Sequence, residues 1–195
     1  MVRFGKETSE GKALLETSEV LFRGGFRLKI PFASIKSAKA VDGELRLLTA
    51  DGLAVFEIGA QAEKWREKIL HPKSRIEKIG LKRGARVSLF GGFDAEFLRE
   101  LKSLGAAMTK GRVAADAEAV FFAADSQKEL SSVRTAAKSL KGAAALWIVY
   151  PKGQNSITES DVIAEGRKAG LKDVKVVGFS RAHTALKFVI PLENR

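Results

Sequence analysis

The sequence predicts two domains of different classes. An antiparallel α+β domain is expected over residues 1–70, a linker over 71–75 and a mainly parallel α/β domain over 76–195. Short apolar runs separated by Gly-Gly and Asp-Gly pairs occupy the first part, and such pairs supply the positive φ of tight hairpins. From residue 86, strand-like and helix-like segments alternate, which is typical of parallel sheets with helical crossovers. Only five residues separate the last two apolar runs, so these two form an antiparallel hairpin.

The N-terminal part is predicted to contain antiparallel strands followed by one helix. The segment "AQAEKWREKIL", residues 60–70, places Ala62, Trp65 and Ile69 on one helical face. Pro72 then disfavours a helical conformation at the residue before it, which predicts a linker. The expected strands are 13–16, 20–23, 26–30, 35–41, 44–48 and 54–58.

This pattern of strands, from residue 13 to residue 59, followed by a helix with a tryptophan on its inner face, resembles the pleckstrin-homology-like fold. The resemblance implies that the helix closes one end of a bent sheet. Inositol-lipid-binding members of that class carry a basic cluster between their first two strands. Here that loop is either residues 17–19, which include no basic residue, or Gly24–Gly25, which is flanked by only Arg23 and Arg27. The resemblance therefore favours a protein-contact or intramolecular role.

The C-terminal part is predicted to alternate strands and helices in chain order. Ser126 with Glu129, and Thr158 with Asp161, have the spacing of capping boxes and mark two helix starts. The expected strands are 85–92, 106–113, 118–125, 144–153, 174–179 and 185–190, and the expected helices are 75–80, 94–105, 126–142 and 158–170.

The final hairpin resembles that of S-adenosylmethionine-dependent methyltransferases, whose Rossmann-like sheets end in this way. A closer resemblance lies in "RIEKIGLKRGARVSL", "ALWIVYPKG", "TESDVIAEGRKAGL" and "DVKVVGFSRAHTALKFV". These segments look like a bacterial family of unknown function with a methyltransferase-like, degenerate Rossmann domain, over about residues 75–191. That family has no established activity, so the resemblance implies a fold and no catalytic residue.

The ends of the buried strands are where such a domain would hold a ligand. In open α/β sheets, ligands bind in the crevice outside the carboxyl ends of the strands. A glycine pair follows the first of these strands, and polar residues follow two later ones. The candidate ligand-binding residues are Gly91, Gly92, Asp94, Asp125 and Lys152, and no catalytic residue is assigned.

Three features of the glycine turn argue against a cofactor. It lacks the G-x-G-x-x-G pattern that lets a backbone approach a dinucleotide. Phe93 would take up space that a cofactor needs. The end of the second strand, near Met108, offers Lys110 and Arg112 in place of an acid for ribose hydroxyls. The sequence therefore predicts no cofactor.

Composition and residue spacing limit the kinds of site and partner that the sequence allows. The 195 residues carry a net charge of +11 and no cysteine, which excludes disulfides and thiolate metal sites and fits a cytoplasmic location. No apolar run is long enough to span a membrane. His71 and His183 have no zinc-site spacing, so no metal is expected, and His183 is interpreted as a solvated turn residue. The basic residues are spread along the chain, so nucleic acid is not the expected partner, although the charge leaves it open.

We therefore expect a non-catalytic cytoplasmic binding or scaffold protein, not an enzyme, with an unknown protein or small molecule as partner. One alternative is an S-adenosylmethionine-dependent small-molecule methyltransferase with an atypical pocket. A second is weak binding of nucleic acid or an anionic surface. An open groove at residues 91–93 favours the enzyme, whereas basic residues gathered on one face favour the second alternative.

Overall fold

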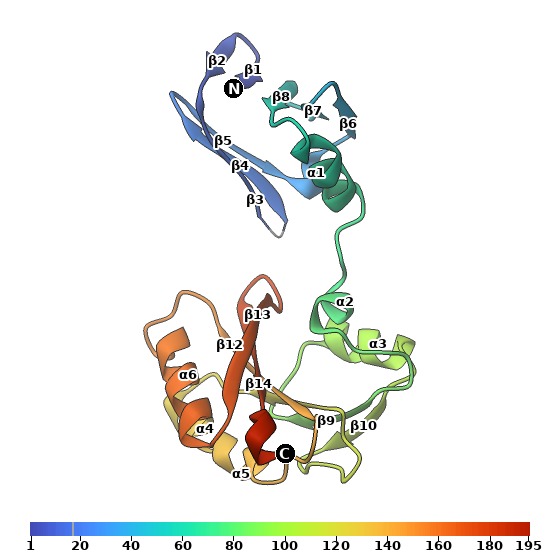
Figure 1. Ribbon diagram of the computed structural model, residues 1–195, viewed down its shortest axis with the longest axis vertical. Helices are drawn as coiled ribbons and strands as arrows, with labels where there is room; N and C mark the ends of the chain where they lie inside the picture. Colours follow the sequence, from blue (N-terminus) through green and yellow to red (C-terminus); the bar gives the residue numbers. More distant parts are fainter. Residues whose placement is uncertain (17) are drawn as a thin grey trace. The chain divides into compact units, whose positions relative to one another are not determined.

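The computed structural model describes residues 1–16 and 18–195, and the chain divides into two compact units, Met1–Lys73 and Ser74–Arg195 (Figure 1). Each unit has its own buried apolar residues. Ser74 and Arg75, which the sequence analysis placed in the linker, belong to the second unit. Ser74 forms a capping box with Glu77 at the start of helix α2 (Arg75–Ile79).

Among its described residues, the N-terminal unit contains eight strands and helix α1 (Gln61–Leu70). Its strand pairs among the described residues are antiparallel, in sheets ordered β2-β1-β8-β7-β6 and β3-β4-β5. Ala62 and Ile69 of α1 are buried and Trp65 is partly buried against the same core. The strands are β1 (Val2–Phe4), β2 (Glu7–Ser9), β3 (Gly11–Leu15), β4 (Glu19–Gly24), β5 (Arg27–Pro31), β6 (Ser37–Val41), β7 (Glu44–Leu48) and β8 (Leu53–Glu57).

Strands β1 and β2 were absent from the sequence prediction. Each has three residues, too few to show a period, and only Val2 among them is buried. Pairing with β8, far along the chain, holds β1 in the sheet. A 3-10 turn (Phe32–Ser34) joins the two sheets along the chain.

The C-terminal unit alternates strands and helices as predicted. Its strands are β9 (Arg86–Phe90), β10 (Ala107–Lys110), β11 (Ala119–Ala123), β12 (Ala145–Pro151), β13 (Lys172–Gly178) and β14 (His183–Val189). After α2, its helices are α3 (Ala95–Ser103), α4 (Gln127–Ser131), α5 (Val133–Ala137) and α6 (Glu159–Lys168), with a 3-10 turn at Leu192–Asn194.

The six-stranded sheet has the order β10-β9-β11-β12-β14-β13. β9, β10, β11 and β12 are parallel, and β13 and β14 form the antiparallel hairpin, so both predictions are confirmed. β14 lies between β12 and β13 and pairs with both. All seven residues of β12 are buried, in keeping with a strand that has a neighbour on each side. The unit thus has a methyltransferase-like, Rossmann-type fold.

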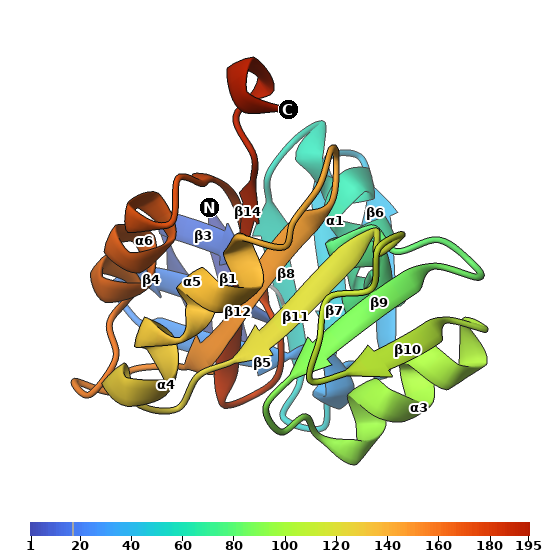
Figure 2. The same ribbon diagram turned by 90° about the horizontal axis from the view of Figure 1, so that it is seen from below.

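Helices cover both faces of this sheet (Figure 2). Residues of α4, α5 and α6 pack with one set of alternate strand residues, including Val120 and Ile148. Residues of α2 and α3 pack with the other set, including Phe121 and Trp147. The chain leaves β9 for β10 on one side and returns to β11 on the other. This reversal places a crevice between the carboxyl ends of β9 and β11.

Gly166 sets how closely α6 approaches the sheet. A Cβ at this position would lie 2.1 Å from a ring atom of Phe188 in β14. We expect Gly166→Ala to lower the free energy of unfolding by about 1–2 kcal/mol through overpacking, although alanine favours helix. Urea denaturation measures this loss. Adding Phe188→Leu should recover part of the difference between the glycine and alanine forms. A neutral or stabilising Gly166→Ala would show that the ring moves aside at no cost.

Candidate functional site

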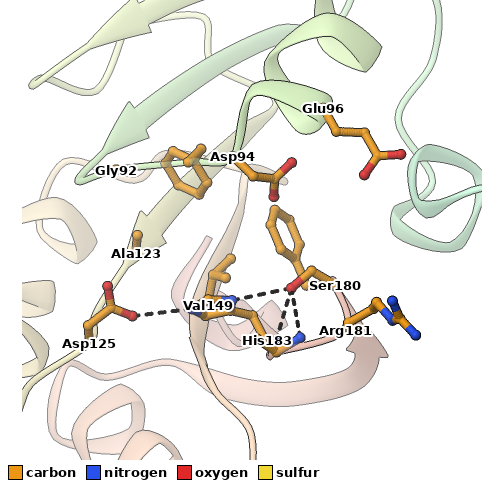
Figure 3. A pocket seen from close by; sticks show the side chains of 12 residues that line it. Gly92, Asp94, Glu96, Ala123, Asp125, Val149, Ser180, Arg181 and His183 are labelled. Carbon is orange, nitrogen blue, oxygen red and sulfur yellow. Dashed lines mark hydrogen bonds and ion pairs between the residues drawn. The ribbon is translucent and has the colours of Figure 1, made fainter.

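A cavity of about 360 Å³ lies at the carboxyl edge of the parallel strands (Figure 3). Its walls come from the β9–α3 turn (residues 92–94 and 96), the end of β11 (residues 123 and 125), Val149 of β12 and the β13–β14 turn (residues 179–183). This is the reversal point of the strand order, where α/β sheets bind ligands. Of the predicted candidate residues, Gly92, Asp94 and Asp125 line the cavity.

The two glycines of the β9–α3 turn have different surroundings. Gly91 has a φ of +85°, and a Cβ there would lie 2.9 Å from the carbonyl oxygen of Ala123. The turn therefore packs directly against the end of β11, and Gly91 does not line the cavity. A Cβ at Gly92 would meet nothing within 4 Å. Gly92 therefore leaves open the space beside the backbone.

Phe93 forms part of the wall. Its ring packs against Phe97, Phe121 and Phe179, with centroid separations of 5.5, 6.4 and 6.2 Å. The sequence analysis expected this ring to occupy the space of a cofactor. The ring is instead partly buried in the aromatic cluster below the turn, and the cavity remains beside it.

Arg75 bonds to residues on two walls of the cavity, Asp94 and Phe179. Its side chain is only 8% exposed. It donates to both carboxylate oxygens of Asp94 (2.9 and 3.2 Å), to Glu100 (2.8 Å) and to the carbonyl oxygen of Phe179 (3.2 Å). The guanidinium carbon also lies 5.0 and 4.7 Å from the ring centroids of Phe97 and Phe179. Arg75 therefore fixes the β9–α3 turn relative to the β13–β14 turn.

The charge of Arg75 shifts the protonation of its partners. Burial raises the pKa of Asp94, but hydrogen bonds from Arg75 and from the Phe97 N–H outweigh burial, so the pKa lies below its usual value. Burial lowers the pKa of Arg75, and its bonds to Asp94 and Glu100 more than compensate, so that pKa is raised. Arg75 was not among the predicted site residues, because nothing local to residue 75 in the sequence indicates contacts with residues 94, 100 and 179.

Asp125, His183 and Ser180 form a hydrogen-bonded chain on the opposite wall (Figure 3). His183 Nε2 lies 3.3 Å from Asp125 Oδ1, and its Nδ1 lies 3.2 Å from Ser180 Oγ. Because a carboxylate only accepts, Nε2 carries a hydrogen, and the neutral ring then accepts at Nδ1 from the Ser180 hydroxyl. Ser180 Oγ also accepts from the backbone N–H groups of Ala182 and His183, which holds the turn.

This chain corrects the interpretation of His183 as a solvated turn residue. Its side chain is 36% exposed and faces a carboxylate that lies 58 positions earlier in the sequence. The contact depends on β14 lying beside β12, where His183 is the register partner of Pro151. The spacing of Asp125 and His183 along the sequence therefore does not indicate this contact.

Lys152, a predicted ligand-binding residue, does not line the cavity. Its Nζ donates to the carbonyl oxygen of Ser180 (2.8 Å), and its backbone N–H donates to that of Ala182 (2.7 Å). Lys152 thus steadies the turn that carries His183. Glu96 and Arg181 line the cavity and form no ion pair with any described residue. Both charged groups are therefore available to a ligand, in addition to the exposed carboxylate of Asp125.

Within residues 1–16 and 18–195, no group of three or more histidine and acidic side chains is placed to hold a metal ion. Among the same residues, no helix has the length and apolar character needed to cross a membrane.

Comparison with known proteins gave structural matches only. No family model and no curated protein matches the sequence. The O-methyltransferase NcsB1 from neocarzinostatin biosynthesis, solved with S-adenosylmethionine and 2-hydroxy-5-methyl naphthoic acid, is 11% identical with a TM-score of 0.43. The match covers 55% of this chain and 49% of NcsB1, so this chain spans about half of that enzyme.

Two other solved structures match similarly. A S-adenosylmethionine-dependent methyltransferase from Aquifex aeolicus is 17% identical over 60% of this chain and 87% of that chain, with a TM-score of 0.42. The pyocyanin biosynthetic protein PhzM is 9% identical over 68% of this chain and 59% of that chain, with a TM-score of 0.45. At these identities the likeness concerns the fold alone.

The main functional expectation is corrected at this point. A non-catalytic scaffold, not an enzyme, was expected, whereas structures of similar fold include S-adenosylmethionine-dependent methyltransferases. No residue role is transferred from those proteins to this chain.

Proposed function

We propose that the C-terminal unit is an S-adenosylmethionine-dependent small-molecule methyltransferase with an atypical pocket. One observation carries this proposal: an open cavity at the strand reversal has the unobstructed Gly92 on one wall and the Asp125–His183 pair on another. A cofactor beside the glycine and an acceptor beside the carboxylate would thus share one crevice. The cavity volume of about 360 Å³ falls within the range of small-molecule sites.

The cavity offers apolar side chains and charged side chains that match the apolar and charged groups of the cofactor. Phe93, Val149 and Phe179 provide an apolar wall for the adenine ring. Glu96 would accept from hydroxyl or ammonium groups, and Arg181 would pair with the amino-acid carboxylate.

The fit departs from the usual pattern at one point. The strand β10 ends at Lys110, followed by Gly111 and Arg112, so no acid stands there for the ribose hydroxyls. Glu96, in the first turn of α3, is the carboxylate left for that contact. The pocket is atypical in this respect.

When bound, the cofactor would supply a methyl group on a sulfonium sulfur: an acceptor nucleophile would bond to the methyl carbon as the carbon–sulfur bond breaks, and S-adenosylhomocysteine would leave. A hydroxyl acceptor must lose its proton as its oxygen bonds to carbon. The Asp125 carboxylate, 69% exposed and facing the cavity, can take that proton. The Nε2–H of His183 orients the carboxylate, and Ser180 holds the imidazole in the required tautomer.

Calorimetry with S-adenosylmethionine and a variant at Gly92 tests the proposal. The backbone at Gly92 is not in the left-handed region and a Cβ meets nothing within 4 Å, so Gly92→Val should fold normally. Its side chain would enter the cavity, and we expect binding to weaken by more than about tenfold, equivalent to about 1.4 kcal/mol. Thermal unfolding of the same sample checks that stability is retained.

Ala164→Val is the matched control, because Ala164 lies on the exposed face of α6. It should bind S-adenosylmethionine as the unmodified protein does. The absence of saturable binding at about millimolar cofactor, a dissociation constant worth only about 4 kcal/mol, would overturn the proposal. So would a Gly92→Val variant with unchanged affinity.

For the N-terminal unit we propose a pleckstrin-homology-like fold that contacts a protein partner. The antiparallel sheets followed by α1, with Trp65 partly buried on its inner face, support this proposal. A cytoplasmic location and membership of the bacterial family resembled by residues 75–191 stay predictions, consistent with the lack of cysteine.

A further inference from the structure

A second cavity, of about 500 Å³, lies at the amino-terminal edge of the parallel strands. Residues 79–82, 115–119, 141, 143 and 144 line it, together with Trp147 and Lys187. These segments precede β9, β11 and β12, so the cavity opens at the edge of the sheet opposite to the candidate methyltransferase site. It shares no lining residue with that site.

Three lysines from three separate segments line this cavity. Lys82 lies between α2 and β9, Lys141 between α5 and β12, and Lys187 within β14. None of them forms an ion pair with a carboxylate among the described residues. The Nζ of Lys187 is 5.8 Å from the ring centroid of Trp147, which fixes where this ammonium lies.

The acidic residues of the cavity are already engaged. Asp116 and Glu118 line it, and both pair with Arg86, at 3.1 and 2.9 Å. One guanidinium thus serves two carboxylates, and the three ammonium groups remain without a counter-ion. Positive charge exceeds negative charge in this cavity, in contrast to the dispersed distribution along the sequence.

We propose that this cavity binds a small phosphorylated ligand through the ammonium groups of Lys82, Lys141 and Lys187. Lysine is a common phosphate ligand because its ammonium is a compact point charge with three donors. The apolar parts of Ile79, Leu81 and Trp147 surround the charged groups and would bury the rest of the ligand. A hollow lined by a few convergent charges suits a small anion better than an extended polyanion, which requires a continuous basic surface.

The full-length protein is titrated by calorimetry with inorganic phosphate, pyrophosphate and ADP at low salt. The tested variant carries Lys82→Gln and Lys141→Gln, two exposed residues whose replacement leaves the apolar core unchanged. Lys187 is retained because it contacts Trp147. We expect saturable binding of pyrophosphate or ADP, and a loss of at least about tenfold in the double variant through the removal of two phosphate contacts.

The charge-matched control is Lys36→Gln with Lys39→Gln, two exposed lysines of the N-terminal unit. It should bind the probes within about twofold of the unmodified protein. Preference for ADP over pyrophosphate indicates a phosphorylated metabolite, and the reverse indicates a free phosphate compound; either outcome supports the site. Gly92→Val, which blocks the other cavity, should leave this binding unchanged, so the two proposals fail independently.

Three outcomes overturn the inference. The first is no saturable binding of any of the three probes by the unmodified protein. The second is an equal loss of affinity in the control variant, which would show general charge attraction. The third is tighter binding of duplex DNA than of pyrophosphate, with the DNA binding dependent on the same two lysines. That result would assign this surface to nucleic acid.

Discussion

Replacing Arg75 with methionine is expected to lower the free energy of unfolding of the C-terminal unit by about 2–4 kcal/mol. Methionine keeps an unbranched apolar stem but removes every hydrogen bond to Asp94, Glu100 and the carbonyl of Phe179. It also removes the cation from the faces of two phenylalanine rings. The estimate stays below the full cost of breaking a buried ion pair because Asp94 and Glu100 are 41% and 28% exposed, so water solvates part of their charge.

Tryptophan fluorescence can follow this unit alone. The chain has two tryptophans, Trp65 in the first unit and Trp147 in the second, so a Trp65→Phe background leaves one reporter. Urea denaturation of that protein with and without Arg75→Met gives the difference. Arg99→Met, at an exposed position of α3, is the control and should cost less than about 0.5 kcal/mol. A loss of less than about 1 kcal/mol for Arg75→Met would contradict the expected role.

The effect of Arg75 should depend on pH. Because the pKa of Asp94 is lowered in the folded state, its ion pair contributes stability above the unfolded pKa of aspartate, about 4. That contribution is lost as the pH falls through the lowered folded value. The difference between the unmodified protein and Arg75→Met should therefore shrink below about pH 4. A constant difference between pH 7 and pH 3 would show that the aromatic contacts alone matter.

Replacing Asp125 with asparagine should lower kcat for methyl transfer to a hydroxyl acceptor by about 10²–10⁴-fold, the range for loss of a general base. Asparagine has nearly the same shape but cannot take up the acceptor's proton. The Nε2–H of His183 can still donate to the amide oxygen, so the wall of the cavity is preserved. Formation of S-adenosylhomocysteine over a panel of phenols and hydroxy acids measures the rate.

Ser180→Ala separates positioning from proton transfer. It removes the hydroxyl that orients the His183 ring but leaves the carboxylate in place, so we expect a smaller loss, about 3–10-fold. Asp51→Asn, in the N-terminal unit, should leave the rate unchanged. An Asp125→Asn enzyme with full activity and an unaltered KM would show that the Asp125–His183 pair is structural.

The sequence alone determined the local features of the C-terminal unit. Ser126 and Thr158 both form the capping boxes that their spacing predicts, because the partners lie within one turn of helix. The apolar runs of β9, β11 and β12 are strands buried in a parallel sheet, since a strand covered on both faces needs no polar alternation. The five residues between the last two runs were too few for anything but a hairpin. The carboxyl edge of the sheet, with Gly92, Asp94 and Asp125, followed from this order.

Only the tertiary structure decided which distant residues meet there. The position of β14 between β12 and β13 brings His183 next to Asp125. Neither the lengths of the strands nor their spacing along the sequence indicates this order of strands in the sheet. Arg75 reaches Asp94 and Phe179 because α2 and α3 cover the same face of the sheet. The three lysines of the second cavity likewise come from segments that are separate in sequence. Contacts within one helical turn are encoded by neighbouring residues, whereas contacts between strands depend on how the whole sheet is ordered.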